Sequence, residues 1–448
     1  MIDWGLLVAV FVGVCLLLTL ILKFRIQAFI SLLISSIVVG VLAGLPPNEI
    51  ISTIQEGMGS TLGFVATVVG LGAMFGAILE SSGGAQALAN TLLTRFGDKK
   101  ATWALTITGF IIAIPVFFDV AFIILIPIVY ALQRKTGNSL LLYAIPLLAG
   151  LAITHAFIPP TPGPVAVADI LNADLGWVIL FGFITGLPAA ILSGPIYGKF
   201  ISNKIFIEAP VLSPEEKFNE SLPSFLSIIL IIGIPILLIV INTIIGSPLI
   251  PENLLPPAFI AWMKVIGHPF VALIIANLVA WSILGLRQGM DKDQLMNIMT
   301  KSMAPAGIII LLTGAGGVFK QTLVNTGTGE MLATYFADKG ISVLIFAYLS
   351  AVIIRVLQGS ATVAMITAAG LTAPLLLSNV SDIERALTVI AIAAGASILS
   401  HVNDSGFWLV GKYLGLTEKQ TFQSWTISTT ILSLVGFVVV LLLSVLIT

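Results

Sequence analysis

The sequence has few charged residues and almost no cysteine. Only 9% of its 448 residues are Asp, Glu, Lys or Arg, whereas 58% are hydrophobic and the mean hydropathy is +1.11. Soluble domains carry about a quarter charged residues, so a large soluble fold is excluded. The single cysteine, Cys15, excludes a disulfide framework, and the net charge of −1 argues against a nucleic-acid partner. We therefore expect an all-α polytopic membrane protein surrounded by a lipid bilayer.

Several catalytic motifs are also missing. Without a G-x-x-x-x-G-K-[ST] loop for ATP, any energy would have to come from an ion gradient. There is no H-E-x-x-H or G-x-S-x-G motif, and only His155, His268 and His401 are available to an intramembrane hydrolase. We expect that the protein is not an enzyme and that it has no metal site and no cofactor. The chain starts without a basic leader region, so we expect Trp4–Leu22 to be a retained helix.

Ten apolar stretches have about the length that crosses a bilayer. They are 4–22, 28–46, 60–82, 138–174, 176–198, 224–245, 264–286, 303–324, 386–412 and 423–447. Polar or proline-rich residues break the stretches 138–174 and 386–412. Two further stretches, 101–133 and 341–376, are each too long for one helix. We predict that both are re-entrant hairpins.

The basic residues favour one orientation of these spans. With both termini outside, all but five of the 20 Lys and Arg residues fall on the inner side, provided that 101–133 enters and leaves there. This asymmetry predicts which loops face the cytoplasm and places both termini on the outer side. Arg355, one of the five exceptions, could pair with an acidic residue or extend toward the outer surface, and we favour the latter.

The two halves of the chain resemble each other. Gly150 and His155 have counterparts in Gly395 and His401, at separations of 245 and 246 residues, and Gly84 corresponds to Gly329. Asp98-Lys99 likewise corresponds to Asp338-Lys339. We predict a first repeat at 1–200, a cytoplasmic linker at 201–223 and a second repeat at 224–448. Five crossings per half make the second repeat inverted, which is typical of secondary transporters with broken helices at the midplane.

Each half contains a segment that interrupts a predicted transmembrane helix. Pro159, Pro160, Pro162 and Pro164 prevent a helix from running through the first break, because proline has no N–H and clashes with the preceding turn. The second break is the polar run from Ser400 to Gly406. Irregular backbone at membrane depth is tolerated only where it is buried in protein or lines a wet cavity. The breaks are therefore the first places to look for a solute.

We expect the two breaks to meet the two hairpin tips, around Phe117-Phe118-Asp119 and Gln358–Thr362. Helix N-termini at such breaks present unpaired N–H groups and a positive dipole end, which suit a carboxylate. Hydroxyl and amide side chains there would suit a small hydroxylated anion. The predicted substrate-binding residues are Phe118, Asp119, His155, Thr161, Gly163, Gln358, Gly359, Ser360, Thr362, Ser400, His401, Asn403, Asp404 and Ser405.

Four of these residues are candidates for proton coupling: Asp119, His155, His401 and Asp404. Three of them have a structural alternative. Asp119 could cap the second hairpin arm, His155 could bond a freed carbonyl in the core, and Asp404 could be a turn residue. An acidic residue in a membrane segment is nonetheless a functional candidate, and histidine titrates near neutral pH.

Four stretches resemble the gluconate:proton symporter family of bacterial permeases. They are Ile114-Pro-Val-Phe-Phe-Asp-Val, His155-Ala-Phe-Ile-Pro-Pro-Thr-Pro-Gly-Pro, Gly359-Ser-Ala-Thr-Val-Ala and Ser400-His-Val-Asn-Asp-Ser-Gly-Phe-Trp. One position departs from the family text, because members commonly have His where this chain has Thr161. That departure makes Thr161 a position that would report on the substrate.

The resemblance implies proton-coupled uptake of gluconate or a related sugar-acid monocarboxylate across the inner membrane. It also implies kinship with anion transporters that have paired hairpins and move by an elevator mechanism, for which a homodimer would supply the fixed frame. The alternatives are symport of another small hydroxylated carboxylate, such as D-serine or another aldonate or uronate. An anion channel or an intramembrane hydrolase is a weaker alternative.

Overall fold

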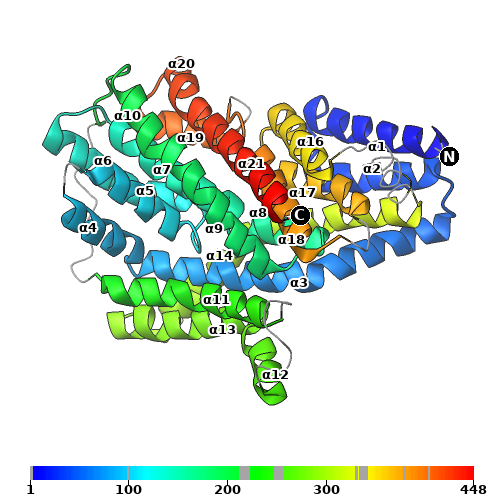
Figure 1. Ribbon diagram of the computed structural model, residues 1–448, viewed down its shortest axis with the longest axis horizontal. Coiled ribbons are helices and arrows are strands. Elements are labelled where there is room, and N and C mark those ends of the chain that lie inside the picture. Colours follow the sequence, from blue (N-terminus) through cyan, green and yellow to red (C-terminus); the bar gives the residue numbers. More distant parts are fainter. Residues whose placement is uncertain are drawn as a thin grey trace.

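The computed structural model describes residues 4–97, 100–210, 222–246, 256–327, 331, 342–376, 380–401 and 404–447. The elements assigned within these ranges are all helical (Figure 1). Eight are long and apolar enough to cross a membrane: Trp4–Ile21, Pro47–Ser81, Leu141–Ile170, Leu175–Ser202, Phe225–Ile245, Pro269–Gln288, Lys292–Asn325 and Glu418–Ile447. The expected all-α polytopic class is confirmed.

The helices of the first half follow the predicted order. They are α1 (Trp4–Leu22), α2 (Ala28–Leu42), α3 (Pro47–Ser81), α4 (Gly84–Phe96), α5 (Ala101–Ile112), α6 (Phe118–Thr136), α7 (Leu141–Phe157), α8 (Pro162–Ile170), α9 (Leu175–Ile191), the π-helical turn η2 (Leu192–Ile196) and α10 (Tyr197–Ser202). Expected span 28–46 is the short helix α2, with 15 residues.

The second half is also made of helices and short helical turns. It contains α11 (Phe225–Gly246), α12 (Pro257–Ile266), α13 (Pro269–Ala280), η3 (Trp281–Gly285), η4 (Leu286–Gln288), α14 (Lys292–Asn325), α16 (Val343–Gln358), α17 (Ala361–Thr372), η5 (Ala373–Leu375), α18 (Asp382–Ala396), α19 (Ser405–Leu414), α20 (Glu418–Thr421), η6 (Phe422–Thr426) and α21 (Ile427–Ile447). The inverted repeat and its domain bounds stay predictions. Landmarks Asp98-Lys99, Gly329 and Asp338-Lys339, and linker residues 211–221, lie outside the described residues.

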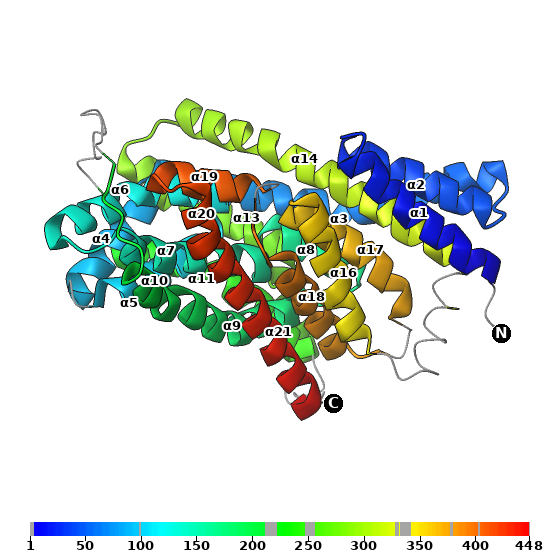
Figure 2. The same ribbon diagram turned by 90° about the horizontal axis from the view of Figure 1, so that it is seen from above.

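Helices α3 and α14 are much longer than the spans predicted at 60–82 and 303–324. They have 35 and 34 residues, roughly 50 Å each, against a hydrocarbon core of about 30 Å. Pro47 opens α3, and an Asp291–Gln294 capping box opens α14, so each helix begins at a strong local start signal. The polar residues that follow do not stop the helix. Both helices run lengthwise through the molecule (Figures 1 and 2).

The long helices touch backbone to backbone. A Cβ atom on Gly57 would lie 2.6 Å from the Cα of Val318, and one on Gly317 would lie 2.2 Å from Oγ1 of Thr61. Only glycine allows this approach, as at close helix crossings in membranes. Helices α3 and α14 thus form a tightly packed pair beside the shorter, broken helices.

Both predicted hairpins consist of two helices joined by a short turn. The first joins α5 to α6 through residues 113–117, and both arms pack on α7. The second joins α16 to α17 at Gly359, whose φ of +90° favours glycine, and Ser360, whose hydroxyl caps α17. The turns coincide with the predicted tips. That each hairpin returns to its own side of a membrane stays a prediction.

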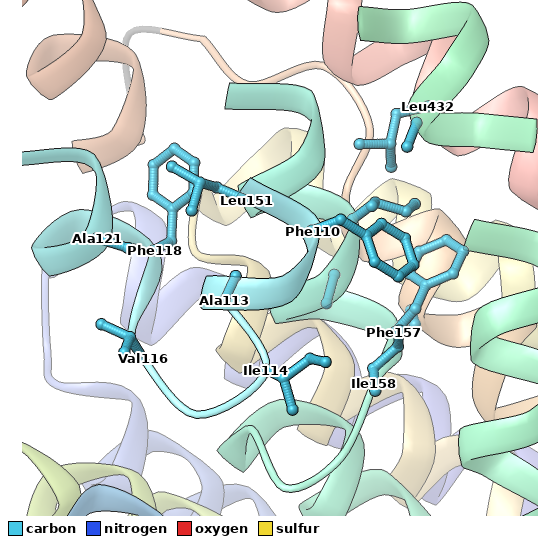
Figure 3. Close-up of a cluster of buried hydrophobic side chains, with 14 of the residues drawn as sticks. Phe110, Ala113, Ile114, Val116, Phe118, Ala121, Leu151, Phe157, Ile158 and Leu432 are labelled. Carbon is cyan, nitrogen blue, oxygen red and sulfur yellow. The ribbon is translucent and has the colours of Figure 1, made fainter. Parts of the chain in front are cut away.

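Both expected breaks are present. The first separates α7 from α8 at residues 158–161, and the second separates α18 from α19 at residues 397–404. Phe157 and Ile158 at the first break belong to one buried cluster with Ile114 and Phe118 of the first hairpin and Leu432 of α21 (Figure 3). Apolar packing therefore fixes the first break against the first hairpin tip.

The last helix of each half contains a π-helical turn, η2 and η6; η2 packs against α21, and η6 packs against α10. The hydroxyl of Ser428 donates to the carbonyl of Ser193 at 3.0 Å, and the Tyr197 hydroxyl donates to the carbonyl of Gln423. These bonds join residues more than two hundred positions apart. They bring α21 and η6 beside the broken helices, where they complete the site.

Candidate functional site

A cavity of about 560 Å³ lies where the two hairpin turns meet the second break. Its walls come from α6, α7, α16, α17, α19, η6 and α21, so segments far apart in the sequence share it. Of the predicted site residues, those that line it are Phe118, Asp119, His155, Gln358, Gly359, Ser360, Thr362, Asp404 and Ser405. The predicted meeting of the tips with the second break is therefore present in the structure.

Three helices begin at this cavity. They are α6 after Phe117, α17 after Ser360 and α19 after Asp404. The Ser360 hydroxyl and the Asp404 carboxylate cap α17 and α19, whereas no side chain caps α6. The positive ends of three helix dipoles thus surround one space, which favours a bound negative charge.

Arg355 on α16 also lines the cavity, and its side chain is only 4% exposed. Its Nη2 lies 2.5 Å from Oδ2 of Asp404, and its Nε donates to the carbonyl of Ile398 at 3.3 Å. The interpretation that Arg355 extends to the outer surface is wrong. Burying an unpaired cation costs free energy, and the Asp404 carboxylate offsets this cost by pairing with the guanidinium. The guanidinium therefore stays inside the protein.

A hydrogen-bonded network holds Asp404 in turn. The fully buried Ser400 hydroxyl donates to Oδ2 of Asp404 at 2.5 Å and accepts from Nε1 of Trp425 at 2.7 Å. The backbone N–H of Ser400 donates to Oγ1 of Thr429, and the Thr426 hydroxyl donates to the Ser400 carbonyl. Asp404 also accepts from the backbone N–H of Gly406 through Oδ1. Ser400 therefore supports the site from behind its wall.

His401 lies beside the cavity and does not line it. Its Nε2 is 2.9 Å from the carbonyl of Val356, which ties the second break to α16. Asn403 lies outside the described residues.

The first half contributes Asp119 and His155 to the walls. Asp119 is exposed and lies in the first turn of α6. There its negative charge interacts favourably with the positive end of the helix dipole. His155 packs edge-on against Phe117, with ring centroids 6.1 Å apart. Its Nδ1 is buried and has no hydrogen-bond partner among the described residues. This arrangement does not match the structural alternative in which His155 bonds a freed backbone carbonyl through Nδ1.

Thr161 and Gly163 do not line the cavity. The Thr161 hydroxyl donates to the carbonyl of Ile158 at 2.6 Å, and the residue is 4% exposed. A Cβ atom on Gly163 would lie 2.7 Å from Sδ of Met365, so this glycine permits close packing of α8 on α17. Both residues serve the local structure of the first break.

Several lining residues were not predicted, chiefly Arg355, Ser397, Trp425 and Thr429. An arginine within an apolar stretch of sequence was itself a signal of a functional site, because burying an ionisable residue in a membrane segment costs free energy. Trp425 offered no such signal. It reaches the site from η6, and its ring stacks on Phe118 with centroids 5.7 Å apart.

A second cavity of about 300 Å³ lies between α3, α14 and the first hairpin. It shares Phe117 and Val120 with the first cavity, and it contains Glu80 and Lys301. The first hairpin tip therefore stands between two spaces.

Comparison with known families decides the class of protein. Residues 5–446 match the family model described as GntP family permease. This chain belongs to the GntP family. The permease is thus a multi-pass membrane transport protein and not an enzyme, and the family resemblance seen in the four sequence stretches is confirmed.

Relatives of this GntP family permease align along nearly the whole chain. It is 42% identical over 429 residues to the low-affinity gluconate transporter of Escherichia coli strain K12, covering 95% of each chain. It is 39% identical to a gluconate permease of Pseudomonas aeruginosa, covering 99% of this chain and 98% of that one. The Gnt-II system L-idonate transporter of Escherichia coli strain K12 is 38% identical, with 97% and 98% covered.

Two solved transporter structures share the fold of the permease. The YdaH transporter of Alcanivorax borkumensis superimposes with a TM-score of 0.61 at 14% identity, covering 88% of this chain and 89% of that one. MtrF of Neisseria gonorrhoeae, described with a class of antimetabolite efflux pumps, gives 0.60 at 16% identity, covering 88% and 84%. At these identities the likeness concerns the fold alone.

Proposed function

We propose that this permease takes up gluconate or a related sugar-acid monocarboxylate together with protons across the bacterial inner membrane. The observation that carries the proposal is the cavity into which three helix N-termini and a buried arginine converge. Relatives named for gluconate and L-idonate support six-carbon sugar acids as the substrate class.

The cavity suits such a solute in size and chemistry. Its volume falls within the roughly 300–1,000 Å³ usual for small-molecule sites. The hydroxyls of Ser360, Thr362 and Ser405 and the amide of Gln358 are available to substrate hydroxyls, and the stacked rings of Phe118 and Trp425 form an apolar wall. The positive helix ends favour the carboxylate.

In addition to Arg355, three titratable residues line the cavity: Asp119, His155 and Asp404. In the proposal, an arriving anion raises the proton affinity of these groups, and a bound proton lowers their repulsion of the anion. This reciprocity is coupling in the thermodynamic sense. One proton per monoanion moves no net charge, whereas two protons would gain about 2.3 kcal/mol per 100 mV.

Alternating access would pass the solute between the two faces of the first hairpin tip, where the second cavity adjoins the first. In this proposal both termini lie on the outer side, and the long α3–α14 pair belongs to a fixed frame that a homodimer would complete. Chemical cross-linking of the purified protein in detergent tests the dimer, and a strictly monomeric species would contradict it.

Proteoliposomes test the transport proposal directly. Uptake of labelled gluconate should rise severalfold under an inward proton gradient. A voltage imposed with valinomycin and potassium should leave uptake unchanged if one proton accompanies each monoanion. Counterflow against L-idonate, other aldonates, uronates, lactate and D-serine ranks the substrates. Gluconate uptake that ignores the proton gradient would contradict symport, and large unsaturable currents would indicate a channel.

A further inference from the structure

The guanidinium of Arg355 is only partly used by the protein. Nη2 pairs with Asp404 and Nε bonds the Ile398 carbonyl, but Nη1 is buried and has no hydrogen-bond partner among the described residues. An arginine side chain carries five N–H donors, and buried donors are normally satisfied. An unpaired donor on a nearly buried residue at a cavity wall marks a place for an acceptor from a ligand.

We propose that Arg355 anchors the carboxylate of the substrate and that Asp404 occupies this anchor when the site is empty. This inference rests on the proposed function, since it names the group that recognises a sugar acid there. Arginine matches a carboxylate with two parallel N–H···O bonds, a geometry that lysine cannot reproduce. Nη1 and Nη2 form such an edge, of which Asp404 holds one nitrogen.

The arrangement couples the anion to a proton through one shared positive charge. The titratable or charged groups that line the cavity are Asp119 from α6, His155 from α7, Arg355 from α16 and Asp404 before α19. A bound carboxylate would be the third carboxylate in a cavity that contains one guanidinium. A proton taken from water onto Asp404 removes one of these charges and loosens the bond to Nη2. The freed Nη1–Nη2 edge then holds the substrate.

A purely structural role is the alternative. The Arg355–Asp404 pair joins α16 to the second break, and losing either partner would leave a buried charge. Single variants alone cannot separate binding from folding. The double variant Arg355→Gln/Asp404→Asn removes both charges together and keeps polar side chains of similar size, so the helix contact is retained without the anchor.

Isothermal titration calorimetry on the purified full chain in detergent tests the proposal, with gluconate and its uncharged analogue glucitol as probes. Wild-type protein should prefer gluconate by at least about a hundredfold, as expected when a charged bond is lost. The double variant should elute as a folded, monodisperse protein and lose this preference.

Arg385→Gln is the matched control. Its guanidinium donates to the Leu171 carbonyl at 2.9 Å, and Arg385 is not among the residues that line the cavity. This variant should bind gluconate within about twofold of wild type. A double variant that binds gluconate as tightly as wild type would overturn the anchor and leave the transport proposal standing. Wild-type protein that binds and carries no sugar acid would overturn both.

Discussion

Each of the two breaks separates a pair of helices, but the two breaks differ in their chemistry. The first break, at residues 158–161, contains no charged residue, is flanked and filled by prolines and is fixed by the Thr161 hydroxyl and apolar packing. The second, at residues 397–404, contains no proline and is held by the Arg355–Asp404 pair and the Ser400 network.

This difference assigns the two breaks different tasks. Proline sterics and apolar contacts do not depend on protonation, so a change of protonation does not alter what holds the first break. The bonds of the second break depend on the charge of Asp404, so a proton or an anion can change them. In the proposed mechanism, the first break is a fixed support that does not line the cavity, and the second break is the part of the site that responds.

The largest expected effect comes from Asp404→Leu, which leaves the Arg355 guanidinium buried without its carboxylate. Removing one partner of a buried pair costs about 3–5 kcal/mol, and we expect a clearly lower unfolding temperature in detergent. The comparison change just after the first break, Pro164→Ala in the first turn of α8, should cost less than about 1 kcal/mol. Equal effects of the two substitutions would show that the breaks are not held differently.

Asp119→Asn should have an intermediate effect. This residue is the acidic group that the first hairpin contributes to the cavity, and it is exposed, so folding should be little affected. We expect proton-driven accumulation of labelled gluconate in proteoliposomes to fall about ten- to hundredfold, or about 1.4–2.7 kcal/mol. Gradient-free counterflow is the control and should persist. Accumulation equal to wild type would remove Asp119 from the coupling site.

The smallest effect is expected for Thr161→Val, which tests the sequence hypothesis that this position reports on the substrate. The substitution removes the hydrogen bond to the Ile158 carbonyl and should cost about 1 kcal/mol of stability. The relative uptake of gluconate and L-idonate should stay within about twofold of wild type, because the residue does not line the cavity. A changed substrate order would return Thr161 to the site.

Features with a local cause were predictable from the sequence. Prolines follow the end of α7, the run from Ser400 to Gly406 overlaps the gap between α18 and α19, and Gly359-Ser360 turns the second hairpin. Pairings over long separations were not. The partner of Arg355 lies 49 residues away, and only the packing of α16 against α18 reveals it.

Two further differences have physical reasons. Thr161 was a plausible contact by position, but its hydroxyl satisfies a carbonyl that the break itself frees. Trp425 enters the cavity from a π-helical turn in the last helix, and the apolar text of that helix does not distinguish a lining face from a lipid face. Tertiary packing, which periodicity does not encode, decides both.

The most direct test of the responsive second break is the number of protons taken up when gluconate binds. Calorimetric titrations in buffers of different ionisation enthalpy measure this number on the purified protein. We predict about one proton per gluconate for wild type and close to none for Asp404→Asn, since binding and protonation are linked through that carboxylate. Binding without proton uptake by wild-type protein, or unchanged uptake in the variant, would contradict the account.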